Sequence, residues 1–169
     1  MTFSEEHVAV IEEAQRLRGW IANAYAQIKF FLGDVIVRSL SMELYQEVGQ
    51  VLPHGSPDRI KRVRRILDVE GLFSEFRDEL SGICDEFEHH HETRNLLAHG
   101  FCEFHYTPTG DCGLQFRKWH RVEGRQDAQL QKTFRLVDLE YERTIIVEPS
   151  QRTLSLFHRI HDRLGLIGQ

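Results

Sequence analysis

The feature that most constrains the fold of this chain is a long apolar stripe near its N-terminus. Apolar residues recur there at steps of three and four, the spacing of one face of an α-helix. The stripe comprises Val10, Ala14, Leu17, Ile21, Ala24, Ile28, Phe31 and Val35. Thr2 with Glu5 fits a capping box that opens this helix. Gly33-Asp34 permits a kink or a short turn before a second helical pattern, which runs through Leu40, Leu44 and Val48.

Two more helices are predicted in the middle of the chain. The segment Pro53-His54-Gly55-Ser56-Pro57 predicts a loop. A short helix follows, in which Ile60, Val63 and Leu67 pack, and Gly71 ends it. Its outward-facing basic residues are Arg59, Lys61, Arg62, Arg64 and Arg65. A longer helix is expected from about Leu72 to His99, and its buried face comprises Phe73, Phe76, Leu80, Ile83 and Phe87.

The pattern changes after Gly100. Phe101–Tyr106 and Leu114–Arg121 predict a β-hairpin, and a third strand is plausible at Leu130–Leu136. Asp138 is placed to N-cap a last helix, which Pro149 would kink or divide. The predicted fold class is therefore mainly α, a single domain over residues 1–169. An antiparallel insert at approximately residues 101–136 precedes the last helix.

Composition sets limits on partners and compartment. A chain of 169 residues with 41% hydrophobic and 28% charged residues is typical of one globular domain. The net charge of −5 argues against a general nucleic-acid binder, so any RNA contact must come from local basic patches. The polar N-terminus predicts no signal peptide, and the longest apolar run, Phe30–Val37, is too short to cross a bilayer. Three cysteines without close pairing favour reduced thiols in a cytoplasmic protein.

The segment Arg94-Asn95-Leu96-Leu97-Ala98-His99 carries the chemistry of the chain. The helical rhythm of the preceding residues places His90 and then Arg94 on the apolar stripe. An Arg there needs an acidic partner, a subunit cleft or an anionic ligand, because burying it unpaired is costly. The purely structural alternative makes His99 a helix-capping residue before Gly100 and Arg94 half of an ion pair.

This run resembles the R-x4-6-H signature of the HEPN superfamily, small helical domains that include metal-independent ribonucleases. The resemblance implies a helical bundle and a homodimer whose two-fold axis brings two copies of the motif into one cleft. It also implies an antitoxin or regulatory partner. HEPN toxins that are modified by a nucleotidyltransferase carry Tyr two residues after the His, whereas this chain has Phe101, which argues against that route of regulation.

RNA supplies its own nucleophile, the 2′-hydroxyl, so a cleavage site needs proton transfer and a cation. An imidazole, with an ordinary pKa of about 6.5, serves as acid or base, and a guanidinium fits two phosphate oxygens. We therefore assign catalysis to Arg94 and His99, with Asn95 orienting the imidazole or binding a phosphate oxygen. His90 or His91 is a candidate accessory group. No metal or cofactor is expected, because consecutive residues such as His89, His90 and His91 point about 100° apart on a helix.

RNA binding is assigned to Arg59, Lys61, Arg62 and Arg65, unless this run is simply a solvated face. The predicted hairpin offers further cations and aromatic side chains, which stack on bases or else cover the bundle or a partner subunit. They are Arg117, Lys118, His120, Arg121, Phe104, Phe116 and Trp119. The predicted function is a metal-independent endoribonuclease of the toxin or phage-defence type. The alternatives are a non-catalytic HEPN-like module that binds a nucleotide, RNA or protein, and an ordinary structural bundle.

Overall fold

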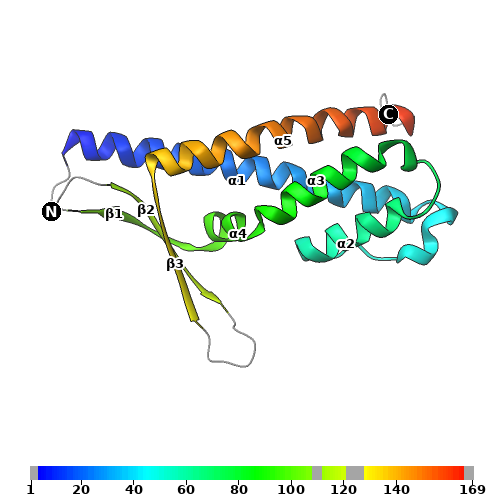
Figure 1. The fold of residues 1–169 in the computed structure, drawn as a ribbon, viewed down its shortest axis with the longest axis horizontal. Coiled ribbons are helices and arrows are strands. Elements are labelled where there is room, and N and C mark those ends of the chain that lie inside the picture. The colour runs from blue at the N-terminus through cyan, green and yellow to red at the C-terminus, as the bar shows by residue number, and fades with distance from the viewer. Residues whose placement is uncertain (1–3, 108–111, 121–127, 166–169) are drawn as a thin grey trace. The chain divides into compact units, whose positions relative to one another are not determined.

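The computed structural model describes residues 4–107, 112–120 and 128–165 (Figure 1). The helices are α1 (Glu5–Leu40), α2 (Ser56–Leu67), α3 (Arg77–His89), α4 (His91–His99) and α5 (Leu136–Arg163). Two 3-10 helices cover Glu43–Val48 and Ser74–Phe76. The strands are β1 (Phe101–Tyr106), β2 (Cys112–His120) and β3 (Ala128–Arg135). The predicted mainly α class, with a small antiparallel sheet before the last helix, is confirmed.

Helix α1 is continuous over 36 residues. Ser4 caps it, because its hydroxyl oxygen accepts a hydrogen bond from the His7 N–H at 3.3 Å. The proposed capping residue Thr2 lies outside the described residues. Gly33 and Asp34 are helical, so the alternative of a short turn there is wrong. A Cβ atom at Gly33 would stand 3.0 Å from a guanidinium nitrogen of Arg59, so the glycine serves a close approach.

The predicted loop and the helices around it begin and end at other residues than expected. The second pattern, expected from Leu40, is the 3-10 helix Glu43–Val48. The loop ends at Gly55, because α2 already includes Ser56 and Pro57. Proline fits the first turn of a helix, where its missing N–H has no intrahelical acceptor.

The segment Leu72–His99 was expected as one helix, and that prediction is wrong. A 3-10 turn precedes α3, and the chain leaves helical geometry at His90, with φ −94° and ψ 10°. Three consecutive histidines have modest helix propensity, and tertiary packing decides whether such a stretch stays helical. The predicted buried stripe itself is confirmed, because all its members are buried: Phe73, Phe76, Leu80, Ile83 and Phe87.

The three strands form one antiparallel sheet in the order β1-β2-β3 (Figure 1). Phe101 pairs with Arg117, and Trp119 pairs with Gln129. Side chains alternate between the two faces of a strand. One face is buried through Leu114, Phe116 and Phe134. The guanidinium of Arg18 from α1 lies over the Phe116 ring on that side, 5.1 Å from its centroid.

Helix α5 begins two residues before the predicted cap. Asp138 lies inside the first turn, where its carboxylate accepts a hydrogen bond from the backbone N–H of Arg135 at 2.9 Å. This is the inner half of a capping box, in which the third helical residue binds the capping residue's N–H. The helix runs through Pro149, so the predicted division there is wrong.

The chain forms two compact units. The first unit comprises Met1–Asn23 and His91–Val147, and the second comprises Ala24–His90 and Glu148–Gln169. The first contains the sheet, α4 and the N-terminal parts of α1 and α5. The second contains α2, α3 and the remaining parts of α1 and α5. A single HEPN-like domain over 1–169 stays a prediction.

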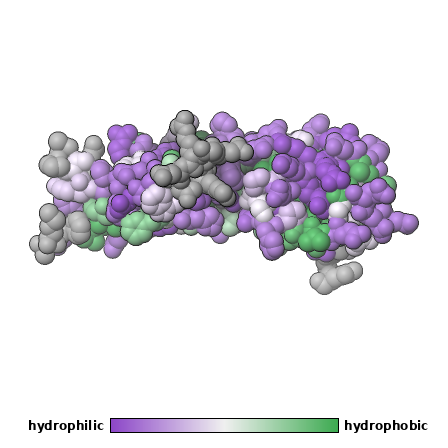
Figure 2. Space-filling model, turned by 90° about the horizontal axis from the view of Figure 1, so that it is seen from below, coloured by the Kyte–Doolittle hydropathy of each residue, from purple (hydrophilic) through white to green (hydrophobic). Residues whose placement is uncertain are grey.

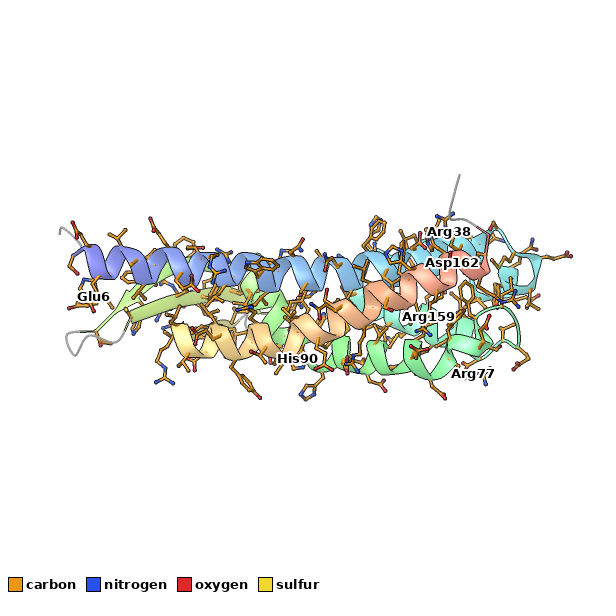
Figure 3. All side chains as sticks on the ribbon, turned by 90° about the horizontal axis from the view of Figure 1, so that it is seen from above. Glu6, Arg38, Arg77, His90, Arg159 and Asp162 are labelled. Carbon is orange, nitrogen blue, oxygen red and sulfur yellow. The ribbon has the colours of Figure 1, made fainter. Side chains whose placement is uncertain are left out.

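Helix α5 is tied to the other helices of the second unit by polar contacts. Ser150 donates a hydrogen bond to Gln27 of α1 at 2.6 Å. Arg159, labelled in Figure 3, forms an ion pair with Glu79 of α3. Exposed ion pairs contribute little to folding, so the buried apolar residues of its helices carry most of the stability of this unit.

On the face drawn in Figure 2, hydrophilic residues predominate and hydrophobic residues form small separate patches. Across the described ranges, no helix is both long enough and apolar enough to cross a membrane.

Candidate functional site

Helix α4 holds the polar motif through a chain of side-chain contacts. Arg94 is buried, with 8% of its surface exposed. Its Nη2 donates a hydrogen bond to the side-chain oxygen of Asn95. The Asn95 amide nitrogen lies 3.1 Å from Nε2 of His91, one helical turn earlier. Arg94 and Asn95, predicted as catalytic, therefore belong to one network with the accessory candidate His91.

Packing fixes the C-terminal part of α4 against the rest of the first unit. Leu96 and Leu97 are buried, and the Leu97 carbonyl accepts a hydrogen bond from Nε of Arg18 at 3.0 Å. Gly100 ends the helix as predicted, and its N–H donates to the Leu96 carbonyl at 2.8 Å. A Cβ atom at Gly100 would stand 2.5 Å from that carbonyl oxygen. The glycine is thus required by a close backbone approach and not by a positive φ, since its φ is not in that region.

His99 is exposed and lines a hollow of about 470 Å³. The hollow lies between the end of α4 and the sheet, and its other lining residues are Phe101, Arg117, Lys118, Trp119 and Gln129. It therefore gathers a titratable ring, two cations and two aromatic side chains. This composition suits a ligand that carries both negative charge and a flat ring.

A second hollow of about 270 Å³ lies beside the N-terminal part of α4. It is lined by His91, Glu92, Asn95, Leu96, Lys118 and Leu130. Lys118 belongs to both hollows, so its side chain links the His99 end of α4 with the His91 end. Among the residues that the structure describes, Lys118 forms no ion pair within 4 Å. Its charge is therefore not neutralised by a described carboxylate.

Arg117 is held in a different way. Its Nη2 forms an ion pair with Glu103 at 2.5 Å, and its guanidinium lies 5.5 Å from the centroid of the Phe101 ring. About a third of each side chain of the pair is exposed. The pair fixes the direction of the guanidinium and partly offsets its charge. Lys118 is consequently the stronger candidate for a direct contact with an anion.

Arg94 and His99 do not share either of these two hollows. They are five residues apart, which places their side chains about 140° apart around an α-helix. Arg94 is buried beside Asn95, whereas His99 opens to the hollow. The third histidine candidate, His90, labelled in Figure 3, directly follows α3 in the second unit, and its ring centroid lies 4.8 Å from that of His89.

The basic side chains of α2 bind backbone carbonyls of the second unit. Arg59 donates to Pro53 at 2.8 Å and to Lys29 at 3.2 Å. Two longer contacts join Arg62 to Val51 at 3.5 Å and Arg65 to Glu47 at 3.4 Å. Lys61 is exposed. A role of Arg59, Lys61, Arg62 and Arg65 in RNA binding stays a prediction, and three of the four have a structural use.

The aromatic residues of the sheet divide into exposed and buried ones. Trp119 is 70% exposed and Phe101 is 64% exposed. Phe116 is fully buried, so of the two alternatives offered for it, base stacking is excluded. Phe101 was missed as a site residue. The hairpin register would have revealed it, because Phe101 lies opposite Arg117, and Trp119 is the next residue on the same face of β2.

Burial disfavours the thiolate form of two of the cysteines. Burial raises the pKa of Cys84 to about 12, and burial also raises the pKa of Cys102. Cys102 and Cys112 pair with Phe116 and Tyr106, so the register does not place them opposite each other. Within the described ranges, no three His, Cys, Asp or Glu side chains are grouped closely enough to hold a metal ion.

No protein-family model matches this chain, and no curated protein or solved structure does either.

Proposed function

We propose that this chain is a metal-independent endoribonuclease of the HEPN type. One observation carries the proposal: the hollow at the end of α4 brings exposed His99 together with Arg117, Lys118 and Trp119. These are the groups that phosphodiester cleavage with an internal nucleophile requires, namely a proton carrier and cations beside the phosphate.

The proposed reaction has a simple balance of atoms. The 2′-hydroxyl loses its proton to an imidazole, and its oxygen attacks the adjacent phosphorus. The bond from phosphorus to the 5′-oxygen breaks, and that oxygen takes up a proton. The products are a 2′,3′-cyclic phosphate and a 5′-hydroxyl end. His99 serves in proton transfer, and Lys118 and Arg117 offset the negative charge that grows on the phosphate oxygens.

Arg94 acts in this proposal by positioning α4 through Asn95, which itself lines the second hollow. Among its described lining residues the hollow holds one histidine, while the reaction needs both a base and an acid. We propose a homodimer that brings a second copy of the motif to the substrate, with His91 and His90 as accessory groups. The resemblance of the motif to HEPN proteins is what supports the dimer.

The test is incubation of purified protein with single-stranded RNA in EDTA, followed by analysis of the product ends. Cleavage that persists in EDTA, leaves cyclic phosphate ends and is lost in His99→Ala is expected. His54→Ala is the matched control, because His54 is an exposed histidine of the loop before α2. EDTA-sensitive cleavage, 3′-hydroxyl ends, or full activity of His99→Ala would overturn the mechanism.

The proposed biological setting is a cytoplasmic toxin or phage-defence system with an antitoxin-like protein partner. Growth arrest on expression, relieved by His99→Ala and not by His54→Ala, is the corresponding measurement in cells. Growth arrest that survives His99→Ala contradicts this setting.

A second candidate is a non-catalytic module that binds RNA or a nucleotide. The observation that favours it is the separation of Arg94, which is buried, from His99, which lines the hollow. In this case the protein binds RNA, and no cyclic phosphate ends form at any protein concentration.

A further inference from the structure

Beside His99 the sheet presents an exposed surface whose aromatic side chains take no part in the proposed cleavage chemistry. Side chains two apart on a strand point to the same face. Arg117 and Trp119 therefore share a face of β2, and their strand partners Phe101 and Gln129 lie on the same side. The opposite face is the buried one. The Trp119 indole is 70% exposed in this position.

The strand register explains why there is a hollow at this place. β1 begins at Phe101, which pairs with Arg117, so β2 continues beyond the start of β1. Lys118 and Trp119 have strand partners in β3 but none in β1. His99 is the last residue of α4, and Gly100 joins it to the start of β1, so its side chain lies beside this overhang. The hollow thus combines a strand edge, an indole and the proposed proton carrier.

We infer that this hollow binds one unpaired nucleotide of single-stranded RNA, with its base stacked on Trp119 and an adjacent phosphate at Lys118. The inference rests on the proposed function, because it names the form of RNA that reaches His99. A base inside a duplex is already stacked on its neighbours, and side chains cannot reach its flat face. A splayed base meets the ring of Trp119. Lys118 alternates to the opposite face of β2, but its side chain also lines this hollow and can meet the adjacent phosphate.

Arg117 and Lys118 differ in their charged partners, which indicates different roles for the two residues. Arg117 is paired with Glu103 and rests on the Phe101 ring, so it forms a fixed wall of the hollow. Lys118 lines both hollows along α4, which suits a phosphate chain that continues from one to the other. Trp119 is therefore a positioning residue for the substrate, Lys118 binds the phosphate, and His99 carries out proton transfer in the proposed reaction.

The chain contains two tryptophans, Trp20 and Trp119, and this permits a direct measurement. In a Trp20→Phe protein, all indole emission comes from Trp119. A single-stranded oligonucleotide with 2′-O-methyl groups has no free nucleophile and cannot be cleaved by the proposed route. Its addition is expected to quench the emission in a saturable way. The same sequence in a duplex, or AMP at equal concentration, is expected to leave the emission nearly unchanged, and equal quenching by either overturns the inference.

Variants then separate stacking from charge. Trp119→Ala is expected to weaken binding between about fivefold and a hundredfold, the range of base–aromatic stacking, while Trp119→Phe keeps most of the affinity. Trp20→Ala is the matched control. Lys118→Ala is expected to lower the slope of log affinity against log salt by about 0.7. Lys132→Ala, an exposed lysine of β3 that lines neither hollow beside α4, is its control and leaves the slope unchanged.

The outcomes distinguish the two proposals. Cleavage with an unchanged KM in Trp119→Ala overturns the stacking site and leaves the ribonuclease in place. Affinity for a dye-labelled single strand that falls in Trp119→Ala, without any cleavage by the unaltered protein, overturns the ribonuclease and supports the nucleotide site. If both hold, Trp119→Ala raises KM and leaves the rate at saturating RNA close to that of the unaltered protein.

Discussion

The guanidinium of Arg94 donates a hydrogen bond to the side-chain oxygen of Asn95, its neighbour on α4. The amide of Asn95 in turn lies against the ring of His91. The polar residues of the motif therefore split into two groups. Arg94 and Asn95 lie in a network at the side of the helix, while His99 opens to the hollow that it shares with the sheet.

Stability should respond very differently to changes in these two groups. Arg94→Ala removes a buried donor and leaves a cavity, so we expect the free energy of unfolding to fall by about 1–3 kcal/mol. His99→Ala truncates an exposed side chain at a helix end and should change it by less than about 1 kcal/mol. Urea denaturation followed by circular dichroism measures both. Equal effects of the two substitutions would contradict the burial of Arg94.

The junction of α4 and β1 should tolerate no side chain at Gly100. A Cβ atom there would stand 2.5 Å from the Leu96 carbonyl oxygen, so Gly100→Ala must displace the backbone that carries His99. We expect a loss of more than about 1 kcal/mol in stability together with weaker RNA cleavage. Gly82→Ala is the control, because Gly82 lies on the exposed side of α3 with open space around it. It should stabilise the protein by about 0.5–1 kcal/mol.

Among the basic residues of α2, Arg59 should matter for folding and Lys61 should not. Arg59 donates to two backbone carbonyls, and its removal leaves them without this donor. Arg59→Ala is expected to cost about 1–3 kcal/mol in thermal or urea denaturation, and Lys61→Ala less than about 0.5 kcal/mol. If this helix also binds RNA, Lys61→Ala lowers RNA affinity at low salt without loss of stability. Unchanged affinity assigns the basic face of α2 to folding alone.

The start of α5 should make a pH-dependent contribution to stability. The hydrogen bond from the Arg135 side chain, followed by that from its backbone, lowers the pKa of Asp138 below its ordinary value of 3.8. The stabilisation is therefore fully present above that pH and is lost as the pH falls through the lower value in the folded protein. Asp138→Ala should cost about 1 kcal/mol at pH 7 and progressively less in acid.

The control for this measurement is Asp162→Ala near the C-terminal end of the same helix (Figure 3). A carboxylate there opposes the helix dipole, so its removal should leave stability unchanged or slightly raise it. A loss at pH 7 that stays constant down to pH 2.5 in Asp138→Ala would contradict the assignment of the cap.

Periodicity predicted which residues form the core but not where helices end. From Ala14 to Val35 every member of the predicted stripe of α1 is buried, because the spacing of apolar side chains directly encodes one face of a helix. The break at His90 was not predictable from that spacing. A histidine adopts helical or non-helical geometry at nearly the same cost, so packing on each side decided it.

The motif itself could be recognised in the sequence, because Arg94, Asn95 and His99 are polar groups that a helix does not need for packing. The hairpin after the motif could also be predicted, because side chains in Phe101–Tyr106 and in the strand after it alternate as they do in a hairpin. The residues that line the hollow with His99 could not be predicted from the sequence. Lys118 and Trp119 are some twenty residues further along, and only the register that pairs Phe101 with Arg117 brings them to the end of α4.

Local sequence thus determined the helical class, the sheet and the identity of the polar motif, because each depends on neighbours three or four residues apart, or two apart in a strand. Tertiary structure alone decided that Arg94 is buried and His99 is exposed, and that Arg59 binds carbonyls of its own unit. Those outcomes depend on which apolar faces meet, and a one-residue shift in helix end or strand register would turn every one of these side chains to another face.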